Sequence, residues 1–214
     1  MSICFLYKKF RSDLSDTKSS SSTFSFFLHY KMWISEYIFK LDTVAAGFMW
    51  TSYPLHQFLH SLNLKGKNVL EFGSGGSTVF FLQRKANLVT FEHSEVWIEK
   101  LKQKLQTYDN WKINLVNYVR RETASNAHEQ YLHGLEEVRD NSLDLVLVDG
   151  RHRVECLRAS IPKVKKNGYI ILDDSDRPEY SEAFELLKEW ESSVVSGFAY
   201  MSDFKTHPVV WKKP

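Results

Sequence analysis

The chain has 214 residues, enough for one α/β domain with an N-terminal extension. A hydrophobic fraction of 43% is sufficient for a packed core and excludes wholesale disorder. The formal charge of +2 is too small to favour nucleic acid or a membrane surface as a partner, and the two distant cysteines match no metal or disulfide spacing.

The sequence also indicates where the protein resides. It contains no apolar run long enough to span a bilayer, and residues 1–10 hold too short an apolar core for a signal peptide. We therefore expect a cytoplasmic protein in a reducing compartment, without a membrane span.

The N-terminal part differs in composition from the rest. Residues 1–23 include a serine run and predict a loose arm. Residues 24–41 carry aromatic and aliphatic side chains at helical spacing, which predicts a helix with a broad apolar face. Three roles stay open for it: packing on the main domain, covering the substrate, or joining two chains in a homodimer. We divide the chain into an arm with an aromatic helix at 1–41 and a main domain at 42–214.

Residues 68–92 predict a strand–turn–helix–strand unit. An apolar run at 69–72 indicates a buried strand, and the glycine-rich stretch 73–78 a turn. A helix through Lys85 and a second strand at 88–91 follow, and this strand ends on Glu92. The glycines let the backbone approach a ligand closely, and an acid about 20 residues later is placed to accept ribose hydroxyls. The unit therefore predicts a nucleoside site.

The details of the turn narrow the choice of nucleoside. A dinucleotide-binding motif requires a third glycine where Thr78 stands, and the turn has no lysine or arginine to meet a triphosphate. Glu71, just before the turn, is unfavourable beside a pyrophosphate but suits a ligand ammonium group.

The pattern Glu71-x-Gly73-x-Gly75-x-Ser77 resembles the first motif of class I S-adenosylmethionine-dependent methyltransferases. The resemblance implies that the cofactor is S-adenosylmethionine, with its methionine part near Glu71 and the glycine turn and its ribose near Glu92. Ser77 replaces the usual last glycine, and we expect it to act as a helix N-cap. The segment before the first strand often touches the cofactor in this family, which adds Trp50 and Thr51 as candidates. The cofactor-binding residues expected are Glu71, Gly73, Ser74, Gly75, Ser77, Thr78, Glu92 and His93.

The rest of the chain alternates strands and helices. Further strands are predicted at 112–116, 143–149 and 169–172, the last entered through a turn at Asn167-Gly168. Helices are predicted at 54–62, 94–105, 128–137, 154–164 and 180–190, with Thr51 or Ser52 capping the first and Ser94 the second. Residues 194–201 and 205–212 predict a hairpin, in which Pro208 marks a bulge or a strand start.

This alternation indicates a mostly parallel sheet. Together with the resemblance, it predicts an α/β Rossmann-like class I methyltransferase fold with seven strands, helices on both faces and a C-terminal antiparallel hairpin. Ligands bind beyond the carboxyl ends of such strands. Because Glu92, Asp149, Asp173 and Asp174 all fall at predicted strand ends, we expect them to share an active site.

Two mechanisms are compatible with these acids. In the first, Asp149, Asp173 and Asp174 hold Mg²⁺, as in the metal-dependent small-molecule and sugar O-methyltransferases that the arrangement resembles. Arg151 stands where those sugar enzymes often carry a second acid, so His152 would act as the base. In the second there is no metal: Asp149 orients the ligands, His152 is the base, and Arg151 or Arg153 binds an anionic substrate.

We therefore expect an S-adenosylmethionine-dependent methyltransferase that acts on the hydroxyl of a small molecule, such as a sugar or glycoside. No Asn/Asp-Pro-Pro-Tyr/Phe motif follows the fourth strand, so a nucleic-acid base is not the expected acceptor. The alternatives are a catalytically inactive binding protein with the same fold and an NAD-dependent oxidoreductase. Thr78 and the lack of a Tyr-x-x-x-Lys pair disfavour the oxidoreductase.

Overall fold

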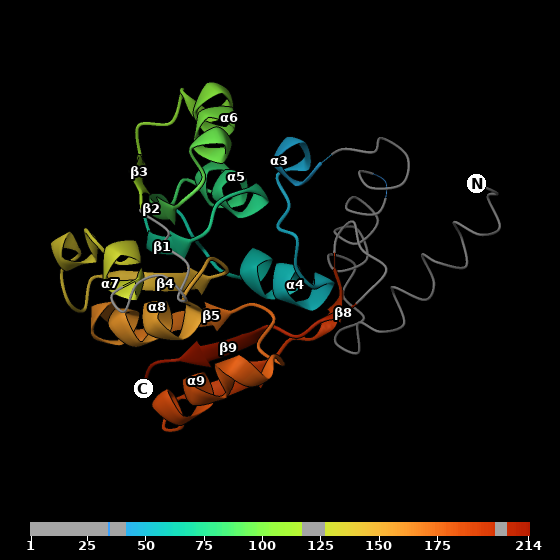
Figure 1. Ribbon diagram of the computed structural model, residues 1–214. Coiled ribbons are helices and arrows are strands. Elements are labelled where there is room, and N and C mark those ends of the chain that lie inside the picture. Colours follow the sequence, from blue (N-terminus) through green and yellow to red (C-terminus); the bar gives the residue numbers. More distant parts are fainter. Residues whose placement is uncertain (1–33, 35–41, 117–126, 200–204) are drawn as a thin grey trace.

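The computed structural model describes residue 34 and residues 42–116, 127–199 and 205–214. The predicted arm and nearly all of the aromatic helix at 1–41 lie outside the described residues. The division of the chain at residue 41 and the homodimer therefore stay predictions. Helices and strands of the described part are arranged in layers around one large sheet (Figure 1).

The main sheet has seven strands in the order β3-β2-β1-β4-β5-β9-β6. Its strands are β1 (Asn68–Phe72), β2 (Asn87–Glu92), β3 (Trp111–Leu115), β4 (Leu143–Val148), β5 (Val164–Leu172), β6 (Glu191–Val194) and β9 (Val209–Lys212). Strands β1 to β5 pair in parallel, whereas β9 is antiparallel to both β5 and β6. The predicted fold class is confirmed.

Helices cover both faces of this sheet (Figure 1). They are α3 (Thr43–Ala46), α4 (Tyr53–Ser61), α5 (Gly76–Gln83), α6 (Glu95–Leu105), α7 (Ala127–Tyr131), α8 (Arg153–Ser160) and α9 (Ser181–Leu186), with 3-10 turns η1 (Leu135–Glu137), η2 (Ile161–Lys163) and η3 (Pro178–Tyr180). Alternate residues of β4 serve two cores. Leu145 and Leu147 pack with α4, α5 and α6, while Val146 and Val148 pack with α7, α8 and α9. This double burial explains why β4 is a continuous apolar run.

Two predicted helix caps are confirmed. The Ser52 hydroxyl accepts the Leu55 N–H at 3.2 Å, and the Ser94 hydroxyl accepts the Trp97 N–H at 3.3 Å. Each hydroxyl satisfies a backbone donor that the first turn of a helix leaves without an intrahelical partner. These caps fix the starts of α4 and α6.

The C-terminal hairpin differs from the prediction in its register and length. Instead of two long strands, β6 pairs with β9 in the main sheet, and β7 (Gly197–Phe198) pairs with β8 (Lys205–Thr206) in a separate ribbon. Pro208 directly precedes β9, so it marks a strand start, where the missing N–H costs no ladder bond.

The predicted turn at Asn167-Gly168 is wrong. Both residues lie inside β5, where Asn167 has a left-handed φ of 62° and the pairing register with β4 shifts. Asparagine tolerates this conformation better than most residues do. The dipeptide therefore makes an irregularity within one strand rather than an entry into it.

The segment before α4 is held against the start of α5. A Cβ added at Gly76 would lie 1.7 Å from the Phe48 carbonyl oxygen, so the two backbones meet at a distance that only glycine permits. This contact positions the chain around Trp50 and Thr51 at the carboxyl ends of the strands.

Among the residues that the structure places, no helix combines the length and the apolar character needed to cross a membrane.

Candidate active site

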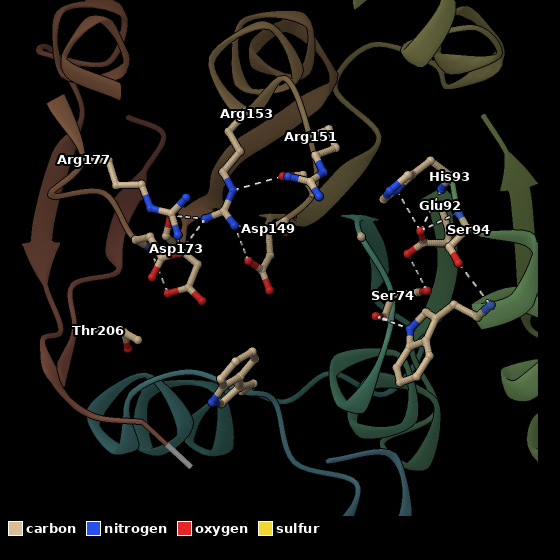
Figure 2. Close-up of a pocket in the computed structure, with 15 residues that line it drawn as sticks. Ser74, Glu92, His93, Ser94, Asp149, Arg151, Arg153, Asp173, Arg177 and Thr206 are labelled. Carbon is tan, nitrogen blue, oxygen red and sulfur yellow. Dashed lines mark hydrogen bonds and ion pairs between the residues drawn. The ribbon is translucent and has the colours of Figure 1, made fainter. Parts of the chain in front are cut away.

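A cavity of about 550 Å³ opens at the carboxyl ends of the parallel strands. Its lining residues are Trp50, Gly73, Ser74, Glu92, His93, Ser94, Trp97, Asp149, Gly150, Arg151, Arg153, Asp173, Asp174, Arg177 and Thr206. Figure 2 shows Ser74 and Glu92 on one side of the cavity and Asp149, Asp173 and Arg153 on the other. The strand-end acids that the sequence singled out thus line one space.

The glycine turn brings the ends of β1 and β4 together. Gly73 has a φ of 89°, and a Cβ added there would lie 3.2 Å from the backbone of Asp149. A side chain would therefore be strained and crowded at this position. Beside the turn, the Trp97 indole donates its N–H to the Ser74 carbonyl at 2.6 Å, which fixes an aromatic ring against the cavity wall.

Glu92 presents a fixed carboxylate to the cavity although its side chain is almost buried. Its Oε1 accepts the N–H groups of His93 and Ser94 at 2.8 and 2.9 Å, and its Oε2 accepts the Ser74 hydroxyl at 2.7 Å. Charge-assisted bonds of this kind hold a carboxylate in place. With the glycine turn and the indole of Trp97, this acid fits the ribose of a nucleoside.

Glu71 lies beneath the turn and does not line the cavity. Its Oε1 accepts the hydroxyls of Thr78 and Thr90 at 2.6 and 2.7 Å, and within the described part of the chain its Oε2 has no hydrogen-bond partner. Burial raises the pKa of Glu71 from 4.5 to about 7, against the opposing effect of the hydroxyl donors. The acid thus anchors the turn from below.

Ser77 is not the predicted N-cap of α5. The Gly75 N–H instead donates to the Thr78 hydroxyl at 3.0 Å, and that hydroxyl in turn donates to Glu71. Of the residues predicted to bind the cofactor, Gly73, Ser74, Glu92 and His93 line the cavity, whereas Glu71, Gly75, Ser77 and Thr78 do not.

On the other side, Asp149 follows β4 and Asp173 follows β5. Burial within the cleft, countered by Arg153 and reinforced by Asp174, raises the pKa of Asp149 from 3.8 to about 6. Asp173 accepts the Asp174 N–H at 3.0 Å and the Thr51 hydroxyl at 3.1 Å. Its own pKa lies well above the ordinary value, first because the group is buried and then because Asp149 and Asp174 carry like charges.

Arg153, the first residue of α8, bridges these strand ends (Figure 2). Its Nη2 donates to Asp149 Oδ1 at 2.8 Å and to the Asp149 carbonyl at 3.2 Å. Its Nη1 donates to the Asp173 carbonyl at 2.6 Å and lies 3.5 Å from Asp174 Oδ2, and its Nε donates to the Gly150 carbonyl at 3.1 Å. All three guanidinium nitrogens are thus engaged within the protein. The second mechanism expected Arg151 or Arg153 to bind an anionic substrate, and this geometry does not support that role for Arg153.

Residues 70–175 match a family model described as "Methyltransferase domain". The match identifies these residues as a methyltransferase domain and confirms the resemblance to the class I S-adenosylmethionine-dependent methyltransferases. No curated protein sequence matches the chain.

Solved structures share the methyltransferase fold at low sequence identity. An S-adenosylmethionine-dependent O-methyltransferase from Thermotoga maritima is 10% identical, with 86% of this chain and 71% of that chain covered and a TM-score of 0.54. A precorrin-6y C5,15-methyltransferase from Geobacter metallireducens is 16% identical, with 74% and 87% covered and a TM-score of 0.52. Fibrillarin from Aeropyrum pernix, solved with S-adenosylmethionine, is 15% identical, with 70% and 68% covered and a TM-score of 0.51. At these identities the likeness establishes the fold.

The predicted magnesium site of this methyltransferase does not fit the geometry. Asp149 Oδ1 and Asp174 Oδ2 both face the Arg153 guanidinium, which stands where a metal ion would have to bind. Across the described ranges, no group of three or more His, Cys, Asp or Glu side chains is arranged to hold a metal ion.

His152, the predicted base, does not line the cavity. It has a left-handed φ of 50° just before α8, and its ring packs edge-on against Tyr131 with centroids 5.6 Å apart. Arg151, which stands where the related sugar enzymes often carry a second acid, lines the cavity and is exposed.

Trp97, Arg177 and Thr206 are among the lining residues of the cavity that sequence reasoning did not assign to the site. Only Trp97 left a signal, because its place in the first turn after the Ser94 cap puts it beside the end of β2. Arg177 pairs with Asp174 on the same strand-end loop, and Thr206 reaches the cavity from β8.

Proposed function

We propose that this protein transfers a methyl group from S-adenosylmethionine to a hydroxyl oxygen of a small molecule, such as a sugar or glycoside. The observation that carries the proposal is a single cavity with two unlike sides. One side offers the glycine turn and the Glu92 carboxylate, and the other offers Asp149, whose pKa of about 6 suits a proton acceptor.

The nucleoside side would hold the cofactor. Glu92 would accept the ribose hydroxyls, and the backbone at Gly73 and Ser74 would contact the methionine part. Trp97 would border the nucleoside through the indole that is tied to the Ser74 carbonyl. When bound, S-adenosylmethionine supplies a methyl group already activated by its sulfonium.

Asp149 takes the role of base that the sequence assigned to His152. Arg153 holds Oδ1 of Asp149 at 2.8 Å, which fixes the carboxylate while 43% of the Asp149 side chain stays exposed in the cleft. The acceptor hydroxyl would give its proton to Asp149 as its oxygen bonds to the methyl carbon and the bond from that carbon to sulfur breaks, with the thioether S-adenosylhomocysteine as the leaving group. A base of this pKa is mostly ionised at neutral pH and therefore available.

The mouth of the cavity would receive the acceptor. Trp50 lies there with 58% of its surface exposed, and Arg151 and Arg177 also line the space. A flat indole face and guanidinium donors are suited to a ring that carries hydroxyl groups. These features support a polar ring compound such as a sugar as the acceptor.

Calorimetry with S-adenosylmethionine and with NAD tests the proposal. We expect S-adenosylmethionine to bind and NAD not to bind, followed by turnover with a hydroxyl acceptor found by screening glycosides. Binding without turnover on any hydroxyl acceptor would favour the non-catalytic binding protein instead. If S-adenosylmethionine does not bind, the proposal fails.

Substitution Glu92→Gln should weaken S-adenosylmethionine binding by about 1–3 kcal/mol, because the ribose hydroxyls lose a charged acceptor. Glutamine keeps the shape of the side chain and an oxygen for the N–H groups of His93 and Ser94. Calorimetry measures the change. Glu99→Gln, on the exposed side of α6, is the matched control and should leave the affinity unchanged. Equal affinity for Glu92→Gln and the parent chain would remove Glu92 from the site.

A further inference from the structure

We infer that Arg153 is a built-in cation that stands in place of a divalent metal, so that this methyltransferase binds no metal at its acid cluster. The acid cluster is Asp149, Asp173 and Asp174. The inference rests on the proposed function, because Arg153 would neutralise the negative charge of the acid cluster beside the place where methyl transfer is proposed.

The contacts of Arg153 are those that a bound cation would make. Its guanidinium meets one carboxylate oxygen each from Asp149 and Asp174 and the carbonyl oxygens of Asp149, Gly150 and Asp173. Hard divalent ions take the same types of oxygen ligand. A metal ion could reach these oxygens only if the guanidinium left.

Burial keeps Arg153 in this position. Its side chain is only 9% exposed, and burial by itself would lower its pKa. The charges of Asp149, Tyr180, Asp173 and Asp174 outweigh this effect and raise the pKa of Arg153, so the side chain carries its charge at every working pH. Removing a buried, paired charge leaves its partners uncompensated. The acid cluster therefore requires a cation, and the chain supplies it.

The fold explains why this arginine, rather than one of its neighbours, fills the space. Arg153 opens α8 immediately beyond the end of β4, and its side chain extends over the end of β5 (Figure 2). Arg177 pairs with Asp174 from the outside and is 49% exposed. Arg158, on the same helix as Arg153, pairs with Glu182 at the surface.

The test is Mn²⁺ binding by the full chain after removal of metals with EDTA, followed by calorimetry and by the paramagnetic resonance signal of free Mn²⁺. The parent chain should show no saturable site at millimolar Mn²⁺. Arg153→Met, which keeps an unbranched apolar stem but removes the guanidinium and its charge, should create a site. Arg158→Met, the matched control, should create none. The double variant Arg153→Met/Asp174→Asn should lose the new site, because one of its two carboxylate ligands is removed.

The inference is overturned if the parent chain binds Mn²⁺ at a site that Asp149→Asn removes, or if folded Arg153→Met binds none. If Arg153→Met does not fold, its refolding by Mn²⁺, followed by circular dichroism, replaces the binding measurement, and no recovery overturns the inference. None of these readouts requires methyl transfer. A failure of S-adenosylmethionine to bind would therefore contradict the proposed function separately.

Discussion

Replacing Asp149 with asparagine should lower turnover by about 10²–10⁴-fold, the usual contribution of a positioned general base. Asparagine keeps the oxygen that Arg153 holds at 2.8 Å, so the strand ends should stay in place while the proton acceptor is lost. Single-turnover kinetics with the acceptor identified by screening measure the effect, and calorimetry should show unchanged S-adenosylmethionine binding.

The pH profile separates a base from a merely structural acid. In the parent chain kcat/KM should rise with pH through about 6 and then level off, because only ionised Asp149 accepts a proton. The rising limb should disappear in Asp149→Asn. Asp176→Asn, at an exposed position beyond β5, is the control and should keep the parent profile. Full activity in Asp149→Asn would show that another group takes the proton.

The second large effect concerns stability. Glu71 has a pKa of about 7 in the folded chain and 4.5 as its ordinary value, because it is buried beneath the glycine turn. Because the pKa of Glu71 is higher in the folded than in the unfolded chain, its contribution to stability is fully present below pH 4.5. That contribution is lost as the pH rises through 7. By pH 8 the loss should be about 3 kcal/mol in the free energy of unfolding.

Glu71→Gln should remove this loss. Urea unfolding between pH 5 and pH 8 measures the free energy of unfolding of the variant and of the parent chain. The slope of this free energy with pH is the quantity to compare. The amide has its own fixed cost in this site, which does not depend on pH. Glu185→Gln, exposed on α9, should keep the parent slope. If the free energy of unfolding changes with pH in the same way in Glu71→Gln and the parent chain, ionisation of Glu71 does not destabilise the fold.

Local signals were sufficient for much of the fold. Strands β1, β2 and β4 are short apolar runs buried on both faces, and the caps at Ser52 and Ser94 depend only on their own helices. Asn167 shows where local signals fail. A left-handed asparagine before a glycine fits a turn or a strand irregularity equally well, and only the pairing of β5 with β4 decides between them.

The site was predictable to the extent that topology alone fixes it. Acids at the ends of parallel strands must lie at one edge of the sheet, so Glu92, Asp149 and Asp173 were found without knowing any side-chain direction. The role of Arg153 was not predictable, because it depends on a side chain that crosses from α8 to β5. The position of His152 outside the cavity lining was not predictable either, because it depends on the packing of its ring against Tyr131.

The antiparallel strand β9 has a consequence for how the chain is made. In the described residues β6 joins the main sheet only through β9, yet the ribosome delivers β6 first. Until residues 209–212 emerge, β5 has one unpaired strand edge and β6 has no partner strand. Nascent chains stalled before this point should therefore be the form that chaperones recognise and that self-associates most readily.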